Sequence, residues 1–240
     1  MNAGIQDKIN EKYKNGKIIK DKIYNFEELK KDQHHSYYSW EHCYSFFRTN
    51  YEELKRIPSN KEMMDLACLH LGFYLASWGM LRGSSALLGK TYTVYGDTIA
   101  VLLKNEYEIC WNPDGQIKNN NSNELIEKIK ALKAELKKPL KVVGTFNASD
   151  TLISKILLGV TGCIPAYDDF FKTGLEMVFR NPLPHGIKTL NDTSLRLLID
   201  FYKEYQRDID EIKIQTNNTK RYPYPIMKKI DMFFWEVGKE

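Results

Sequence analysis

The chain lacks the features that are typical of a secreted protein, of a membrane-spanning protein or of a protein stabilised by a structural zinc site. Its four cysteines, Cys43, Cys68, Cys110 and Cys163, are widely spaced and form no Cys-x-x-Cys pair. This spacing argues against a structural zinc site or a disulfide framework and favours free thiols in a reducing cytoplasm. No apolar run reaches the roughly 18 residues that a membrane helix needs, and the N-terminal stretch is polar and charged, unlike a secretory signal. We therefore expect a cytoplasmic protein with no membrane segment.

The chain also lacks an internal repeat and the alternating polar and apolar pattern of strands. Nearly every periodic segment has helical spacing instead. A length of 240 residues with 42% hydrophobic content is enough for a substantial core. We predict an all-α protein with a single globular multi-helix domain over residues 1–240 and little or no β-structure. At most, a soft boundary is expected at the Asn-rich loop 112–123, NPDGQIKNNNSN.

Apolar periodicity places the expected helices. They cover residues 24–31, 34–48, 61–79, 98–111, 124–137, 151–160, 168–180, 194–212 and 224–237. Ser59 opens the Ser-x-x-Glu pattern of a capping box before the third helix, and the apolar character of that helix on all sides predicts a central buried position. Thr91–Tyr95 is compatible with a short extended segment. Trp40, Tyr44 and Phe47 share one helical face, which favours core packing over stacking on nucleobases.

Positive charge is concentrated in two stretches of the sequence. The formal net charge is only +4. Residues 116–141 hold seven Lys against three Glu, and residues 212–230 hold five Lys or Arg and no acid. These stretches are either solvated helix faces and loop tips or a track that binds the phosphates of DNA or RNA.

The most informative segment is SDTLISKILLGVTGCIPAYDDFFKTGL, residues 149–175. It predicts a buried helix, a short connection that contains a proline, and an acidic pair at the start of a second helix. Asp168 and Asp169 would lie near the positive end of the helix dipole, where a carboxylate can act as a base or stabilise a cationic transition state. The alternative is that one Asp caps the helix and the other is solvated. Lys155, on an apolar helix face, is either a second candidate catalytic residue or a side chain that extends to the surface.

Residues 154–175 of this segment, SKILLGVTGCIPAYDDFFKTGL, resemble the second half of the helix-hairpin-helix DNA glycosylase core. In that family a helix leads through an apolar connection to a proline, an aspartate and an apolar residue three positions later. Asp168 with Phe171 matches this last part. The resemblance implies an all-α fold that flips a base out of the duplex, with Asp168 stabilising the oxocarbenium-like sugar as the base leaves.

Three features differ from that family. Only Gly144 lies where the glycine-rich hairpin would precede the helix. Lys155 is closer to Asp168 in the sequence than the lysine that bifunctional members use as a nucleophile. The cysteines form no cluster that could hold an iron–sulfur centre. We therefore expect no cofactor.

The stretch WGMLRGSSALLGKT, residues 78–91, supplies further candidate ligand-binding residues. Its end is similar to a phosphate-binding P-loop, but Ser84 lies where that loop requires glycine, which argues against nucleotide binding of this kind. Trp78, Arg82 and the neighbouring acid Asp169 remain candidates for ligand binding. Arg82 either binds a phosphate or carboxylate ligand or, as we favour, pairs with Asp168 or Asp169.

Two alternative functions remain open. The segment RNPLPH, residues 180–185, has the spacing of Arg and His seen in HEPN-type ribonucleases, which would make Arg180 and His185 catalytic on RNA. Pro182 and Pro184 cannot continue the helix in which that family carries its motif. The other alternative is a non-catalytic protein-interaction or oligomerisation module, in which the 15 Tyr and 11 Phe form a core and a surface for a homo-oligomer or partner.

The histidines do not predict a metal site. His35 and His42 share a helical face, whereas Glu41 points elsewhere, so no His-Glu-x-x-His arrangement forms. His70 lies on the helix expected to be buried and is interpreted as a hydrogen-bonded core histidine. Without three converging ligands, we expect no bound metal.

Overall fold

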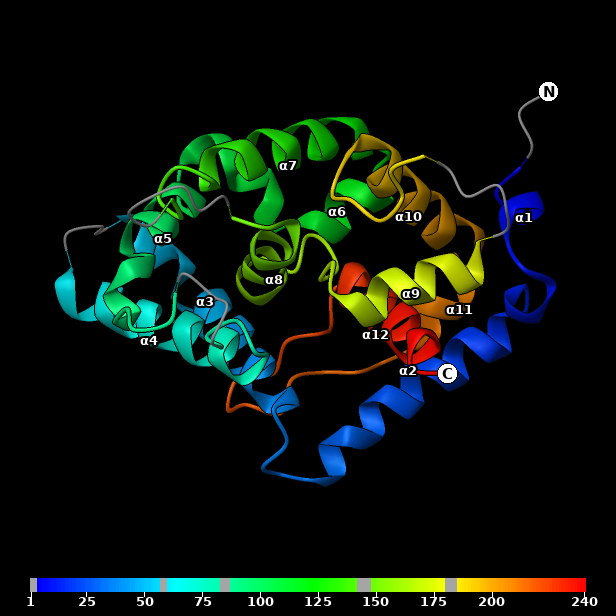
Figure 1. Cartoon of the computed structure of the whole chain (residues 1–240), viewed down its shortest axis with the longest axis horizontal. Coiled ribbons are helices and arrows are strands. Elements are labelled where there is room, and N and C mark those ends of the chain that lie inside the picture. The colour runs from blue at the N-terminus through cyan, green and yellow to red at the C-terminus, as the bar shows by residue number, and fades with distance from the viewer. Residues whose placement is uncertain (1–3, 57–59, 83–86, 142–147, 180–184) are drawn as a thin grey trace.

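Helices supply the regular secondary structure throughout the described chain. The computed structural model describes residues 4–56, 60–82, 87–141, 148–179 and 185–240. Within these ranges β-structure is limited to two isolated bridges, between Ile9 and Phe179 and between Gln215 and Pro223. The predicted all-α single domain is confirmed (Figure 1).

The described residues of the N-terminal half form five α-helices and four short 3₁₀ helices. These elements are α1 (Ile5–Lys8), η1 (Glu11–Tyr13), α2 (Gly16–Glu27), η2 (Glu28–Lys31), α3 (Tyr37–Arg56), α4 (Lys61–Ser77), η3 (Tyr92–Tyr95), α5 (Gly96–Leu102) and η4 (Asn105–Trp111). The remaining α-helices are α6 (Pro113–Lys118), α7 (Ser122–Leu136), α8 (Asp150–Val160), α9 (Asp169–Val178), α10 (Asp192–Glu204), α11 (Gln206–Glu211) and α12 (Ile226–Gly238).

Several helices begin and end close to their predicted bounds, and other segments differ. The predictions for α4, α7, α8, α9 and α12 agree within a few residues. The helix predicted at 24–31 begins earlier, at Gly16, and the expected helix 98–111 is divided into α5 and the 3₁₀ helix η4. Residues 92–95 are 3₁₀-helical rather than extended. The capping residue of α4 is Asn60, whose side chain accepts a hydrogen bond from the Met63 amide; the predicted cap, Ser59, lies outside the described residues.

Helix α4 is not buried on all sides, contrary to the prediction. Its inner face packs against α3 and η3 and buries Leu71 and Leu75. Its outer face leaves Leu66 exposed and Phe73 64% exposed. The error arises because the hydrophobic pattern of the helix has almost no angular preference, so the sequence does not show which side meets solvent.

The Asn-rich segment 112–123 is folded rather than an exposed loop. Pro113 occupies the first turn of α6, Asn112 caps this helix, and Ile117 is buried. An Asp114 carboxylate oxygen accepts a hydrogen bond from the Ile226 amide at 3.0 Å, which ties α6 to the start of α12. The first half of this segment is therefore helical and joined to α12.

Helices α9 and α12 make the closest helix contact in the fold. A Cβ atom added to Gly174 would overlap with the Phe234 carbonyl oxygen, and one added to Gly238 would overlap with the Phe170 carbonyl oxygen. Glycine at both positions thus allows the two backbones to touch. The aromatic rings of Phe171, Phe179 and Phe234 fill the space around this contact. The contact holds α12 beside the segment that carries Asp168.

A buried carboxylate joins α3 to the segment that precedes α12. The Glu41 side chain, with no solvent exposure, forms an ion pair with Lys30 at 2.8 Å and accepts hydrogen bonds from the Tyr224 hydroxyl and from the Asn217 amide at 2.7 Å. In Figure 1 this segment, in orange, runs alongside α3 before it reaches α12. Glu41 therefore holds residues from three distant parts of the chain.

Replacing Glu41 by Gln should destabilise the fold strongly. The substitution keeps the shape but leaves the Lys30 ammonium without its full counter-charge in a buried site, which costs about 3 kcal/mol. We expect the midpoint of thermal unfolding to fall by about 6–12 °C. Urea unfolding of the variant measures the loss directly. Glu52→Gln, on an exposed position of the same helix, is the matched control and should change the free energy of unfolding by less than about 0.5 kcal/mol. Equal effects of the two variants would contradict the assignment.

All four cysteines are buried free thiols. Hydrogen bonding to the Cys163 thiol, together with burial, raises the pKa of Cys110. Within the described part of the chain, none of the helices combines the length and apolar character that crossing a membrane requires.

Candidate functional site

The candidate site is built by the connection from α8 to α9. Ser149 caps α8, its hydroxyl accepting a hydrogen bond from the Leu152 amide at 3.1 Å. At the other end of α8, Gly162 has a φ of +68°, a left-handed conformation that lets the chain leave the helix sharply. The chain then returns to Asp168, which caps α9 by accepting a hydrogen bond from the Phe171 amide at 3.1 Å. This reversal places Asp168 beside Lys155 of α8.

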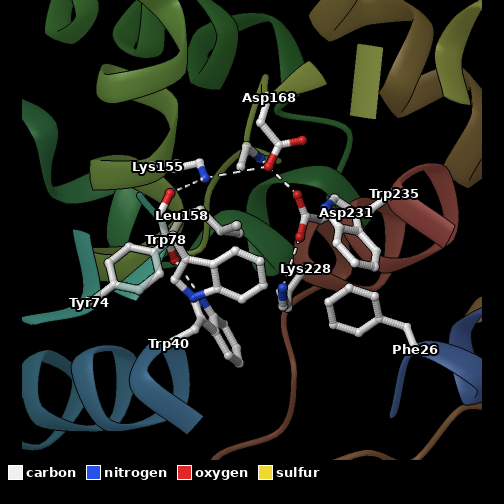
Figure 2. Close-up of a pocket in the computed structure, with 11 residues that line it drawn as sticks. Phe26, Trp40, Tyr74, Trp78, Lys155, Leu158, Asp168, Lys228, Asp231 and Trp235 are labelled. Carbon is white, nitrogen blue, oxygen red and sulfur yellow. Dashed lines mark hydrogen bonds and ion pairs between the residues drawn. The ribbon is translucent and has the colours of Figure 1, made fainter. Parts of the chain in front are cut away.

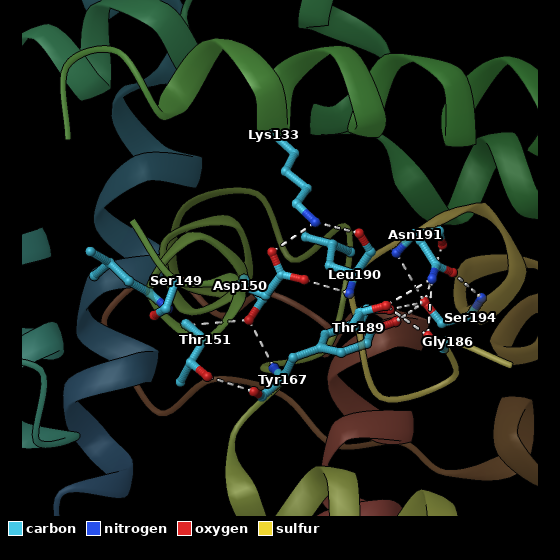
Figure 3. Close-up of polar contacts among 12 residues, drawn as sticks. Lys133, Ser149, Asp150, Thr151, Tyr167, Gly186, Thr189, Leu190, Asn191 and Ser194 are labelled. Atoms are coloured by element: carbon cyan, nitrogen blue, oxygen red, sulfur yellow. Dashed lines mark hydrogen bonds and ion pairs between the residues drawn. The ribbon is translucent and has the colours of Figure 1, made fainter. Parts of the chain in front are cut away.

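A network of hydrogen bonds fixes the chain just before Asp168 (Figure 3). The Tyr167 amide donates to the Ser154 hydroxyl at 2.8 Å, and the Tyr167 carbonyl accepts from the Thr151 hydroxyl at 2.8 Å. The Tyr167 hydroxyl donates to Ser194 at 2.9 Å, and Ser194 belongs to a capping box that opens α10. Both backbone polar groups of Tyr167 are therefore held by α8 and its side chain is held by α10, so the residue just before Asp168 occupies a defined position.

Lys155 is buried, and its side chain does not reach the surface. Only 4% of the residue is exposed. Its ammonium donates to the Trp78 carbonyl at 3.1 Å, lies 3.5 Å from Asp168 Oδ2, and stands 5.4 Å from the centre of the Trp78 ring. Burial lowers the pKa of Lys155, and the Asp168 carboxylate partly opposes this shift.

The Asp168 carboxyl is affected in the opposite direction. Burial raises its pKa, the nearby Lys155 ammonium lowers it, and the Asp231 carboxylate raises it again. A partly buried acid and a buried amine whose pKa values move toward each other are typical of sites that handle protons, and also of structural ion pairs.

A second buried ion pair lies behind the first (Figure 2). On α12, Lys228 and Asp231 form an ion pair at 2.8 Å, and Asp231 Oδ1 also accepts a hydrogen bond from the Ala166 amide at 2.9 Å. Lys155, Asp168, Lys228 and Asp231 line a shared small pocket of about 10 Å³, which has room for about one water molecule. The two pairs therefore form one polar cluster inside an aromatic shell.

Lys155 and Asp168 also line an open cleft of about 450 Å³. This volume is typical of a small-molecule site. All five candidate site residues from the sequence line this cleft, namely Trp78, Arg82, Lys155, Asp168 and Asp169. The aromatic side chains of Phe170 and Trp235 complete its walls, together with Ser77, Met80, Ser149 and Thr151. The Lys155–Asp168 ion pair therefore lies between the solvent in this cleft and the buried polar cluster.

The favoured pairing of Arg82 is not found. Asp168 pairs with Lys155, and Asp169 lies 3.8 Å from the Lys172 ammonium with its own side chain 97% exposed. Among the described residues, neither acid has an ion pair with Arg82. Arg82 and the exposed acid Asp169 therefore both line the cleft, where a ligand can contact either side chain.

Several residues of the site were not identified in the sequence. Asp231 and Trp235 come from α12, and Lys228 had been assigned to an exposed basic stretch although it is only 2% exposed. The available signal was a Lys and an Asp three positions apart within IMKKIDMFFW, because charges so spaced on an otherwise apolar helix share a face and pair in the core. No sequence spacing indicated that this pair would lie behind Asp168.

The basic stretch 212–230 is not a continuous surface. Lys228 and Lys229 are buried, and burial lowers the pKa of Lys229, whose ammonium donates to the Ile209 carbonyl at 3.0 Å. Lys220 and Arg221 remain exposed. In the stretch 116–141, Lys130 and Lys133 pair with acids, whereas others such as Lys137 and Lys138 are exposed.

The remaining candidates are not brought to the cleft. Arg180, Gly144 and Ser84 lie outside the described residues, and His185 is exposed and does not line the cleft. His70 is half-buried and stacks on Phe46, with a ring-centre distance of 4.2 Å. Among the described residues, no group of three or more His, Cys, Asp or Glu is arranged to hold a metal ion.

Comparison of the chain with protein-family models, with curated proteins and with solved structures finds no match.

Proposed function

We propose that the cleft between α4, α8, α9 and α12 is an active site that breaks the N-glycosidic bond of a nucleotide unit in DNA or RNA. The observation that carries the proposal is the Lys155–Asp168 pair, 3.5 Å apart, at the junction of an aromatic-walled cleft and a buried polar cluster. This geometry is consistent with the glycosylase resemblance of residues 154–175, which motivated the choice of reaction.

Asp168 is the proposed catalytic residue. As the bond from the sugar C1′ to the base nitrogen breaks, its electron pair leaves with the base and positive charge develops on the sugar ring. A fixed carboxylate beside that ring stabilises the charge more strongly in the transition state than in the ground state. A water molecule then bonds to C1′, and Asp168 accepts the proton that is passed to the departing base.

Lys155 is the proposed positioning residue. Its ammonium is held by the Trp78 carbonyl and faces Asp168 Oδ2, so it keeps the carboxylate ionised and oriented despite burial. The Lys228–Asp231 ion pair lies behind Lys155 and Asp168, and its two opposite charges balance each other. The Asp168 carboxylate therefore remains ionised in the site without being fully exposed to water.

The walls of the cleft are suited to a planar base. Trp78, Phe170 and Trp235 present aromatic surface on which a flipped base can stack, with about 1–3 kcal/mol for each stacked base. Arg82 at the rim is placed to contact an adjoining phosphate. Stacking would bring the sugar toward Asp168, at the inner end of the cleft.

An excision assay tests this proposal. The protein is incubated with single- and double-stranded oligonucleotides that carry one uracil, hypoxanthine or N-alkylated purine, and alkali converts each abasic site into a strand break. Binding of the same oligonucleotides and of matched RNA is measured at about 50 and 200 mM salt. We expect abasic sites in at least one substrate and binding that weakens steeply with salt.

Absence of abasic sites together with absence of binding at low salt would overturn the proposal. The non-catalytic interaction module would then be the better explanation, and it requires a molecular mass that rises with protein concentration. Binding to RNA with strand cleavage but no base loss would favour the ribonuclease alternative, with Arg180 and His185 as its test positions.

A further inference from the structure

A second cleft, of about 380 Å³, lies between α3, α4 and the loop 217–220. It does not share a residue with the proposed active site. Every polar residue that lines it can donate a hydrogen bond, and none of the described lining residues is a carboxylate. The lining residues are His42, Ser45, Phe46, Thr49, Asn50, His70, Asn218, Thr219 and Lys220.

One residue that lines this cleft, Ser45, has a buried hydroxyl without a hydrogen-bond partner among the described residues. Ser45 is 3% exposed, and its Oγ makes no hydrogen bond within the described structure. A serine inside a helix usually bonds to a backbone carbonyl of the preceding turn or faces water. Leaving a buried polar group unpaired costs about 1–3 kcal/mol, so a native protein needs a reason to keep one. A ligand that accepts this hydrogen bond supplies that reason.

The walls of the cleft are held in place by contacts of their own. His70 of α4 stacks on Phe46 of α3 with 19° between the rings, which fixes the imidazole. Across the cleft, the loop is fixed by the hydrogen bond from the Asn217 amide to buried Glu41. The Thr49 hydroxyl lies 2.9 Å from the Tyr222 hydroxyl, which joins α3 to the end of the same loop. The donors therefore face a site of defined shape.

Lys220 supplies positive charge at the rim. The residue is exposed, and its ammonium lies 5.3 Å from the centre of the Tyr222 ring. Together with the imidazoles of His42 and His70 and the Ser45 hydroxyl, it gives an anion several donors and a counter-charge. A tetrahedral oxyanion has the acceptors to use them, and phosphate is the form in which nucleic acids present it.

Helix α4 connects this cleft to the proposed active site. His70 lines the second cleft and Ser77 lines the first, and residues seven apart lie on one face of a helix, about 10 Å apart along its axis. Between them on the same face is Phe73, which is 64% exposed. An exposed ring between a donor-rich cleft and an aromatic cleft is arranged as a stacking platform for single-stranded nucleic acid.

We propose that the cleft of α3, α4 and loop 217–220 binds a phosphate of the same strand whose base enters the Asp168 cleft, with Phe73 stacking on a base between the two. The identity of the strand rests on the proposed function, whereas phosphate binding by the second cleft does not. The proposal thus defines a path for a single strand along α4.

Proton NMR of the histidine rings tests the phosphate site. The chain has five histidines, and His42 and His70 line the cleft while His34, His35 and His185 do not. Titration with inorganic phosphate, and separately with a thymidine pentanucleotide, should shift the ring signals of His42 and His70 and leave the other three unchanged. No shift of either signal with inorganic phosphate would overturn the proposal.

Three variants sharpen the test. Lys220→Gln and Ser45→Ala should each raise the half-saturating phosphate concentration about tenfold, because each removes a donor to a charged group. Ser45→Ala should not lower the unfolding temperature, since the hydroxyl has no partner in the protein, so its binding loss cannot be attributed to misfolding. Lys17→Gln, an exposed lysine on α2, is the matched control for Lys220 and should leave phosphate binding unchanged.

The pentanucleotide distinguishes a strand from free phosphate. Phe73→Ser should weaken pentanucleotide binding about tenfold or more and leave inorganic phosphate binding unchanged. Phosphate shifts without pentanucleotide shifts would overturn the strand path. Pentanucleotide shifts at His42 and His70 without base excision would support the strand path while contradicting the proposed glycosylase reaction, so the two failures are separable.

Discussion

Asp168→Asn should reduce base excision by about 100- to 1,000-fold while leaving the fold intact. The substitution removes the negative charge that would face the developing positive charge on the sugar, and loss of one such electrostatic group typically has this effect. Asn is also a favoured N-cap residue, so the hydrogen bond from the Phe171 amide can be kept. Single-turnover excision rates measure the loss, and circular dichroism checks the helix content.

Asp169→Asn is the matched control. The two acids are neighbours, but the Asp169 side chain is 97% exposed and is paired only loosely with Lys172. We expect its excision rate to stay within about twofold of the unmodified protein, because a solvated charge contributes little. If the two substitutions lower the rate equally, Asp168 has no special role.

The pH dependence gives a second signature of Asp168. The reaction requires the ionised carboxylate, so activity should be lost as the pH falls through its pKa. Burial raises that pKa, the Lys155 ammonium lowers it in part, and Asp231 raises it. The acid limb should therefore lie above the ordinary aspartate value of about 3.9. In the Asp168→Asn protein the remaining activity should lack this limb, an outcome that a merely structural defect would not give.

Gly174→Ala should destabilise the fold strongly. The new Cβ would overlap with the Phe234 backbone carbonyl, so α9 and α12 would have to separate. Overpacking of this kind costs about 3 kcal/mol, and the unfolding temperature should fall by about 6–12 °C. Because α12 carries Asp231 and Trp235, excision should fall as well, even below the unfolding temperature.

Gly96→Ala provides the comparison. A Cβ at this position meets nothing within 4 Å, and the backbone φ of −54° is open to any residue. Alanine at the start of α5 should leave stability unchanged or raise it by up to about 1 kcal/mol, because it reduces the freedom of the unfolded chain. Thermal unfolding of both variants in one buffer tests the pair. Similar midpoints for the two would show that the α9–α12 contact is less close than described.

The sequence predicted the local parts of the candidate site. A helix cap at one of the two acids, Asp168 or Asp169, was among the sequence interpretations because capping depends on residues only three positions apart; the structure shows that the cap is Asp168, which accepts from the Phe171 amide. The same local rules gave the approximate bounds of α7 and α8. Lys155 was located on an apolar helix, although its burial and its partner were not determined.

Other parts of the site depend on contacts between distant segments. Asp231 faces the region of Asp168 only because glycine at position 174 lets α12 approach α9 closely. Neither periodicity nor spacing encodes which helix approaches which, so Asp231 and Trp235 could not be assigned. The exposed face of α4 was missed for a related reason: its apolar residues surround the helix, and tertiary packing alone determines that Phe73 remains in solvent.

The contact between α9 and α12 also determines when the site can form during synthesis. Asp168 and Lys155 leave the ribosome well before α12, which ends at Gly238. At about 5–20 residues per second, the intervening chain takes several seconds to translate. During that time the apolar face of α9 has no helix to cover it, and Asp168 lacks the Asp231 pair behind it. The newly made chain would therefore spend those seconds with the apolar face of α9 uncovered, and the buried polar cluster could be completed only after α12 has been made.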